Sequence, residues 1–214
     1  MQKYALWLIL FFSSAVFCQD QLVLKHETEF MPTHSNRFSA ALGLNPSLTK
    51  SSNITNFTFS LAKKLENFWL DGTLALTSGV FRELSANNAA ATGATDAQLE
   101  DQKNTLMTIG IGIARESQYA QTLLPIENLY EMMAANLTYN SYKEDYSGKT
   151  FMGPGLIAKF SLYKKFNDYF SAGGHFNYNL AVVERDENTA NETTSNRSLT
   201  LGFVTVGVDL SFYL

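Results

Sequence analysis

Histidine and serine side chains are the groups of this 214-residue chain that could carry nucleophilic chemistry. A hydrolase of that kind needs a base within hydrogen-bond reach of the nucleophile and a third group that orients the base. His34 and Ser35 are adjacent, so on a strand their side chains would point to opposite faces. His175 has Asn177 two residues later but no serine at that spacing, and His26 has only a threonine there. The histidines therefore indicate packing roles, and we expect no enzyme.

The sequence contains no motif that is typical of a metal, cofactor or nucleic-acid site. The acidic groups at residues 100–101 and 186–187 lie in polar segments and do not show the alternation of a calcium loop. The single cysteine, Cys18, excludes an internal disulfide and a cysteine-based metal site. No glycine-rich phosphate loop occurs. The formal net charge of −4 argues against a nucleic-acid surface. We expect no cofactor, no metal and no nucleic-acid partner.

The last eleven residues, 204–214, alternate strictly between two kinds of side chain. Successive side chains of a strand point to opposite faces, so one face would be wholly apolar while the other carries the carboxylate of Asp209. A hydrocarbon membrane on one side and a polar lumen on the other satisfy both faces. The apolar face comprises Val204, Val206, Val208, Leu210, Phe212 and Leu214.

The same segment resembles the C-terminal assembly signal of bacterial outer-membrane barrels. That signal has a polar residue, a glycine two positions later and hydrophobic residues at alternate positions, which correspond here to Thr205, Gly207, Leu210 and Phe212. The chain ends on Leu214 where a terminal aromatic is usual. The resemblance implies that the barrel-assembly machinery is a partner through the last strand.

Further segments alternate in the same way, as expected of tilted strands, which need on the order of ten residues to cross a membrane. They lie within residues 57–61, 68–80, 107–113, 156–162 and 170–182, with weaker candidates at 37–45 and 129–142. The spacers are tight turns at 65–67 and 166–168, and longer polar segments at 46–53, 83–104, 143–149 and 184–196. The chain thus resembles the small bacterial outer-membrane β-barrels of OmpA/OmpX type. We predict an all-β, antiparallel transmembrane barrel of eight strands.

Two segments leave the strand count and one connection open. Residues 22–30 alternate weakly, so ten strands remain an alternative. The connection at 116–127 is long, contains Pro125 and runs into residues 127–136, whose helix-forming residues could make a short helix.

The N-terminus predicts export. Residues 1–18 have the pattern of a signal peptide, with a positively charged start, an apolar run at 5–12 and small residues after it. The apolar run is too short to span a bilayer as a helix. Acylation of Cys18 is the alternative, although Phe17 is large for the position before a lipidated cysteine. Residues 19–214 then form one domain, with 19–35 as a periplasmic lead-in and the outer membrane as its location.

Strand parity sends six polar residues to the lumen: Asp71, Lys159, His175, Asn177, Asn179 and Asp209. An eight-stranded barrel is only about wide enough for its own side chains. We therefore expect a self-satisfied network in which Lys159 pairs with Asp209 or Asp71, because a charge in a narrow lumen needs a partner. The alternative is a narrow polar conduit with these groups as its lining.

Two short stretches, 60–69 and 161–170, share a serine, a pair of lysines, a turn and then aromatic residues. We interpret both as membrane-boundary devices, with the lysines next to lipid headgroups and the aromatics in an interfacial girdle.

The resemblance implies a structural or surface-interaction role through the loops 83–104 and 184–196, in contact with outer-membrane lipid and lipopolysaccharide. A monomer with an unidentified extracellular ligand is expected. A narrow channel for ions or small polar solutes is the second hypothesis, and a soluble periplasmic β-sandwich is the third.

Overall fold

The computed structural model describes residues 34–45, 52–81, 83–86, 104–145, 148–185 and 197–214, which belong to one compact unit, His34–Leu214. The expected signal peptide, the weak strand at 22–30 and all but the last two residues of the lead-in 19–35 lie outside these residues. The elements are β1 (Asn36–Leu44), β2 (Ser52–Leu65), β3 (Phe68–Val80), β4 (Glu83–Ala86), β5 (Asn104–Ser117), α3 (Tyr119–Leu123), β6 (Leu129–Lys143), β7 (Thr150–Asn167), β8 (Phe170–Arg185) and β9 (Arg197–Tyr213). Among the described residues, no helix is long and apolar enough to cross a membrane.

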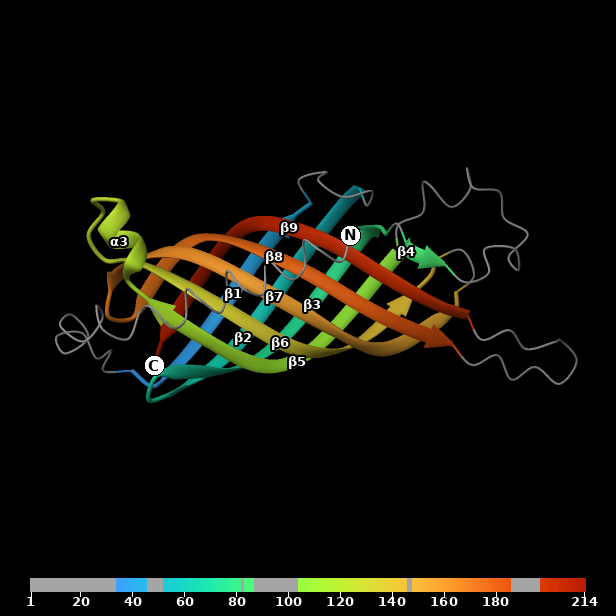
Figure 1. The fold of residues 1–214 in the computed structure, drawn as a ribbon, viewed down its shortest axis with the longest axis horizontal. Coiled ribbons are helices and arrows are strands. Elements are labelled where there is room, and N and C mark those ends of the chain that lie inside the picture. The colour runs from blue at the N-terminus through green and yellow to red at the C-terminus, as the bar shows by residue number, and fades with distance from the viewer. Residues whose placement is uncertain (1–33, 46–51, 82, 87–103, 146–147, 186–196) are drawn as a thin grey trace, which may run out of the picture. The chain divides into compact units, whose positions relative to one another are not determined.

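The sheet closes on itself (Figure 1). Strands β1, β2, β3, β5, β6, β7, β8 and β9 pair antiparallel in that order, and β9 pairs back onto β1 from Arg37↔Tyr213 to Leu44↔Val206. This arrangement confirms the prediction of an all-β, eight-stranded barrel. Both of the weaker strand candidates are strands of this barrel, namely β1 and β6.

The register fixes how far the strands tilt. Following direct partners from Phe38 around the barrel leads to Gly202 on β9. The partner of Phe38 on β9 itself is Phe212, so the sheet closes with a stagger of ten residues. With this stagger, eight strands incline roughly 40° to the barrel axis and enclose a space that side chains can fill.

The two faces of the wall differ as the alternation predicts. On β9, Val206, Val208, Leu210 and Phe212 are exposed on the outside, whereas Thr205, Asp209 and Ser211 are buried inside. Large exposed apolar residues follow the outer face of the other strands as well. The β-sandwich hypothesis is wrong, because it requires these faces to pack on a second sheet.

The barrel has a short-turn end and a loop end. At the short-turn end lie the turns Glu66–Asn67 and Asp168–Tyr169, the helix α3 and the C-terminus. Backbone hydrogen bonds join Asn36 and Leu214 there in both directions, at 3.1 and 2.9 Å. The opposite end, where residues 46–51, 87–103, 146–147 and 186–196 connect the strands, is the loop end.

The helix in the long connection is not where the sequence suggested. Residues 127–136 are helix formers, yet Leu129–Lys143 is strand β6, hydrogen-bonded to β5 on one side and β7 on the other. Two complete ladders outweigh the modest helix propensity of these residues. The helix α3 lies earlier, at Tyr119–Leu123, and ends before Pro125, which cannot continue it.

A ninth, short strand completes the wall at the loop end. Strand β1 reaches only Val206 of β9, and β4 pairs farther along, from Glu83↔Leu201 to Ala86↔Leu199. The chain between β3 and β4 carries Phe81, which is buried against the inward-facing rings of Tyr142 and Phe203. The segment after β3 therefore both fills the barrel mouth and adds to its wall.

The turn between β2 and β3 provides a test of the backbone geometry. Glu66 has φ of 43°, whereas Asn67 does not have a positive φ. A positive φ at the first central turn position favours glycine. We expect Glu66→Gly to raise the free energy of unfolding by about 1 kcal/mol, since the strain of a left-handed non-glycine residue is relieved. Urea unfolding of the refolded protein measures this, and Asn67→Gly is the control that should bring no gain. Equal effects would contradict the assigned turn.

Candidate functional site

The interior of the barrel is layered. Polar side chains fill the middle, and a buried apolar cluster lies at each end. The loop-end cluster consists of Ile54, Phe81, Leu106, Tyr142, Phe151, Ala181, Val183, Leu199, Leu201 and Phe203. The short-turn cluster consists of Ala62, Trp69, Ala114, Tyr130, Met132, Ala134, Tyr163 and Tyr213. The expectation of a lumen lined by polar and small residues thus describes only the middle layer.

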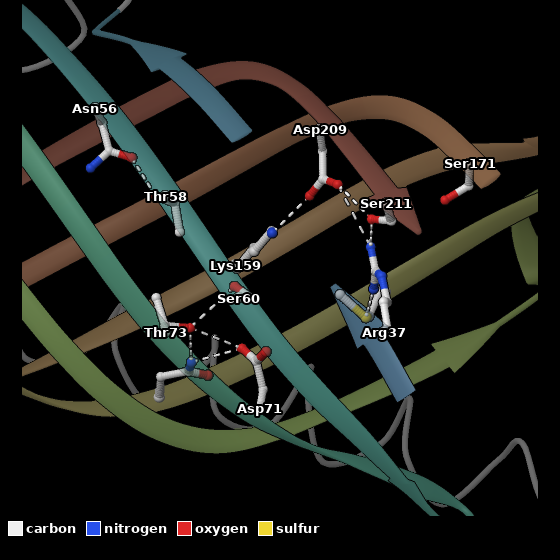
Figure 2. Close-up of polar contacts among 12 residues, drawn as sticks. Arg37, Asn56, Thr58, Ser60, Asp71, Thr73, Lys159, Ser171, Asp209 and Ser211 are labelled. Carbon is white, nitrogen blue, oxygen red and sulfur yellow. Dashed lines mark hydrogen bonds and ion pairs between the residues drawn. The ribbon is translucent and has the colours of Figure 1, made fainter. Parts of the chain in front are cut away.

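The strongest polar contact of the middle layer is between Lys159 and Asp209. The Lys159 ammonium donates to Asp209 Oδ2 at 2.8 Å, and both side chains are buried (Figure 2). Arg37 also faces this carboxylate, with its Nη2 3.7 Å from Asp209 Oδ1 and 2.7 Å from the hydroxyl of Ser211. Ser211 in turn donates to Asp209 at 2.9 Å. One carboxylate is therefore held by two cations and a hydroxyl.

Arg37 is a member of this group that the sequence analysis did not single out. It is 3% exposed and lies on the first strand, directly beside the last one. The parity of β1, with Phe38 and Leu42 outside, already places Arg37 on the inner face. The alternation of β1 thus indicated an inward Arg37. An arginine at the end of a weakly predicted strand is, however, equally typical of the membrane boundary.

Asp71 belongs to a separate group. Its Oδ2 accepts from the hydroxyl of Thr73 at 3.1 Å and from the amide of Asn136 at 2.8 Å. Asn136 also donates to Thr73 at 2.7 Å, and Ser60 lies 3.4 Å from the same hydroxyl. Within the described residues, Asp71 has no lysine or arginine at ion-pair distance. The structure thus gives Lys159 to Asp209, the first of the two partners considered.

A small cavity joins these two groups. It has a volume of about 10 Å³ and is lined by Asp71, Asn136, Lys159 and Asn177 among others. The side-chain oxygens of Asn136 and Asn177 are buried without a hydrogen-bond partner in the protein. A cavity of this size holds about one water molecule. The space is therefore too small for an organic ligand.

His175, Asn177 and Asn179 follow one another along the inner face of β8, and all three are buried. His175 lies over the junction of the first and last strands, where Gly43 pairs with Gly207. A Cβ atom at Gly43 would stand 3.0 Å from His175 Nε2 and 3.1 Å from the Cβ of Thr205. The absence of a side chain at Gly43 therefore makes room for the imidazole.

The structure brings His175 opposite a serine that sequence spacing could not reveal. Ser161 on β7 is its direct cross-strand partner, and both side chains are buried. The Ser161 hydroxyl makes no hydrogen bond, so the pair lacks the contact through which a base activates a nucleophile. Both residues also lie in the polar layer between the two apolar clusters. Among the described residues, no group of three or more His, Cys, Asp or Glu side chains could hold a metal ion.

The boundary interpretation of the two lysine–aromatic stretches is partly wrong. Lys63, Lys164, Phe68 and Tyr169 are exposed, as expected. Trp69, in contrast, is 1% exposed and belongs to the short-turn cluster. Neighbouring residues of a strand point to opposite sides, so one member of each pair must face inward.

Lys165 is another inward-facing residue of these stretches. Its ammonium lies 2.8 Å from the carboxylate of Glu116 and 3.9 Å from the ring centre of Tyr130. Tyr163 also donates to Glu116, and the ring of Tyr213 lies 4.9 Å from the ammonium. An ion pair enclosed by tyrosines thus closes the interior at the short-turn end.

The residues proposed as an assembly signal divide between the two faces of β9. Leu210 and Phe212 are exposed on the outside, Thr205 is buried inside, and Gly207 pairs with Gly43 at the closing seam. Recognition by the assembly machinery remains a prediction from the resemblance.

Comparisons with known proteins find similar solved structures but no matching family model and no matching curated protein. Neisserial surface protein A is 12% identical, with 84% of this chain and 95% of that chain covered and a TM-score of 0.48. Ail, the attachment invasion locus protein of Yersinia pestis, is 10% identical over 82% of this chain and 95% of its own, with a TM-score of 0.32. A major outer membrane protein from Thermus thermophilus is 11% identical over 84% of this chain and 100% of its own, with a TM-score of 0.39. The strand pairing of this chain itself shows a closed, eight-stranded antiparallel barrel.

Removal of the Lys159 ammonium tests the central ion pair. Lys159→Ala leaves the Asp209 carboxylate buried with Arg37 as its remaining cation, so we expect a loss of about 3 kcal/mol in the free energy of unfolding. Urea unfolding in detergent or bilayers measures the loss. Lys164→Ala, an exposed outward neighbour on the same strand, should change stability by less than about 0.5 kcal/mol. Similar stability of both variants would show that the pair contributes nothing.

A rescue experiment tests the packing of His175 against the junction of β1 and β9. Gly43→Ala should destabilise the barrel by about 1–3 kcal/mol, because the new methyl group meets His175 and Thr205. His175→Ala in the same chain should recover part of this loss. Gly72→Ala is the matched control, since its Cβ would have only an ordinary contact of 3.6 Å. A double variant no more stable than Gly43→Ala would show that the imidazole is not the obstacle.

Proposed function

We propose that this protein is an integral outer-membrane barrel with a closed, non-conducting interior, and that its function resides in the surface loops that the barrel carries. A continuous apolar outer wall supports the membrane location. Leu61, Ile111 and Leu137, for example, are 61–71% exposed on three different strands. Water-soluble monomers rarely expose apolar areas of this extent, whereas a lipid-facing barrel requires them.

Closure of the sheet supports the same proposal. In hydrocarbon every backbone donor and acceptor must be paired within the protein, so spanning sheets have no free edge. Here the first and last strands pair from Arg37↔Tyr213 to Leu44↔Val206. The wall is therefore closed along the part of β9 that carries the exposed apolar residues.

The packing of the loop-end cluster is the main observation that supports a closed interior. Phe81 lies within 5.7 Å of the Tyr142 ring centre and 5.3 Å of the Phe203 ring centre, and Tyr142 lies 6.0 Å from Phe151. Buried aromatic side chains from four segments of the chain thus fill the barrel where a solute would enter. A narrow channel would need a polar path through this layer, so the packing argues against the channel hypothesis.

A closed barrel leaves its polar loops as the place for recognition. The predicted loop 83–104 begins with strand β4, and the strand ends that flank residues 87–103 and 186–196 lie at the loop end, opposite the C-terminus. Loops on a rigid scaffold are common sites of binding, because the scaffold keeps its shape while the loops vary. We therefore place the surface-interaction role on these two segments, with the short-turn end in the periplasm.

The partners that follow are lipids and the assembly machinery. The exposed Leu210 and Phe212 on the last strand would be accessible to that machinery before insertion. Outer-membrane lipid and lipopolysaccharide would surround the apolar wall. Export through a signal peptide cleaved near residue 18 completes the proposal.

Conductance measurement tests the closed interior. Protein that has been shown to insert, by a gel mobility that shifts on boiling, should give no discrete openings in a planar bilayer, because the loop-end cluster blocks the lumen. Reproducible openings that are altered by Lys159→Ala would contradict the closed interior and support the channel hypothesis.

Surface labelling tests the orientation. An epitope tag inserted within 186–196 should be detected by antibody on intact cells. The same tag in the turn Asp168–Tyr169 should be detected only after the outer membrane is permeabilised. Labelling of intact cells in the reverse pattern would invert the topology and remove the loops from the cell surface.

A further inference from the structure

The helix α3 and the residues that follow it form an exposed apolar surface that the barrel itself does not explain. Tyr119, Leu123, Leu124 and Ile126 are exposed, with Leu123 at 68%. No residue of the stretch 118–126 is charged. Buried residues are absent from the helix, so its apolar side chains do not stabilise it by packing on the protein. A different surrounding must favour them.

The strand residues beneath the helix show on which side of the wall it lies. Leu129 and Glu131 share the strand parity of Met133 and Leu137, which face outward and are exposed. Leu129 and Glu131 are nevertheless 6% and 7% exposed. Contacts between α3 and β6 account for this burial. The helix therefore covers the outer face of the wall, not the mouth of the lumen.

Glu131 fastens the helix to this position. Its two carboxylate oxygens accept from the backbone N–H groups of Tyr119 and Ala120, at 2.8 and 2.7 Å. Ser117, its direct partner on β5, also donates to it. A carboxylate on the outer face would be costly next to lipid, and these donors satisfy it. The helix is thus held against the outside of the barrel by these hydrogen bonds, and its apolar side chains are exposed.

The surroundings of the helix match the headgroup layer of a membrane. The exposed apolar row of β5, which includes Ile109, Ile111 and Ile113, ends at the exposed Arg115, two residues before Ser117. On β7, the exposed Lys164 is the direct partner of Leu129. Two outward cations thus flank the helix where the apolar wall ends. Basic residues in this position suit anionic phospholipid headgroups.

We propose that the segment 118–126 is a membrane-interface anchor, in which Tyr119, Leu123, Leu124 and Ile126 insert among the phospholipids of the leaflet at the short-turn end. The inference rests on the proposed membrane location of the barrel. Lipid is favoured over a protein partner because the helix covers the outer face of the wall, on the side of the lipid-facing residues, and because Arg115 and Lys164 are outward cations there. Such an anchor would fix the depth and the tilt of the barrel on one side.

Spin-label accessibility tests the anchor. Single cysteines at Leu123 and at Gln121, on opposite sides of the helix, are placed in a full-length chain that carries Cys18→Ser, and nitroxide labels are attached. The proteins are reconstituted in vesicles of phosphatidylethanolamine and phosphatidylglycerol. Collision with oxygen, which concentrates in lipid, is compared with collision with a water-soluble nickel chelate. Labels at Leu137, in the middle of the apolar wall, and at Asp168, in a turn, give the two reference environments.

The anchor predicts an oxygen-to-nickel collision ratio at Leu123 that is several-fold above that at Asp168 and below that at Leu137. The label at Gln121 should resemble that at Asp168. If the collision ratio at Leu123 equals that at Asp168 while the ratio at Leu137 is high, the helix lies in water. The anchor is then wrong, although the membrane location of the barrel is supported. If Leu137 also matches Asp168, the proposed membrane location itself fails.

One further outcome separates lipid from protein. A Leu123 label that is open to the nickel chelate in vesicles, but shielded from both reagents in isolated outer membranes, would identify a protein as the occupant and overturn the lipid anchor. Tyr119→Cys repeats the measurement on the same side of the helix, in case the label at Leu123 displaces it.

Discussion

Closure of the sheet between β1 and β9 is the constraint on which the rest of this structure depends. Pairing the first strand with the last, at a stagger of ten residues, fixes the tilt of every strand and with it the width of the interior. It also removes the free edges that would otherwise pair with other chains. The closing seam contains Gly43 opposite Gly207, where a Cβ on Gly207 would overlap the Leu42 carbonyl oxygen. A glycine of the proposed assembly signal is therefore also a packing requirement of the finished barrel.

A fixed and narrow interior explains how the polar groups are arranged. Charges enclosed there need partners, and Asp209 obtains them from the first strand through Arg37 and from β7 through Lys159. The network thus joins strands that are far apart along the chain. Apolar clusters at both ends separate this layer from the solvent, which strengthens its electrostatic contacts. The same arrangement is the basis of the proposed closed interior.

The outer wall follows the opposite rule, and one polar residue on its outer face is informative. Apolar residues cover the outside of each strand, while Glu131 lies on that face beneath α3. The backbone of a short helix satisfies the carboxylate that the wall could not leave exposed to lipid. This explains why a connection at the short-turn end is long and carries a helix, when the other two connections there are tight turns.

The sequence alone indicated the eight long strands, their inward and outward faces, and the six polar residues that the structure buries, because side-chain alternation is a local property of two-residue period. It did not indicate the short strand β4, which lies in the segment 83–104 that we expected to be a polar loop. It did not determine which residues of different strands meet. The choice of Asp209 over Asp71 for Lys159, the place of Ser161 opposite His175, and the insertion of Phe81 between Tyr142 and Phe203 all depend on register and closure. Propensity likewise misplaced the helix, since two ladders hold 129–143 as a strand. Register is a long-range property, and only the closed barrel decides it.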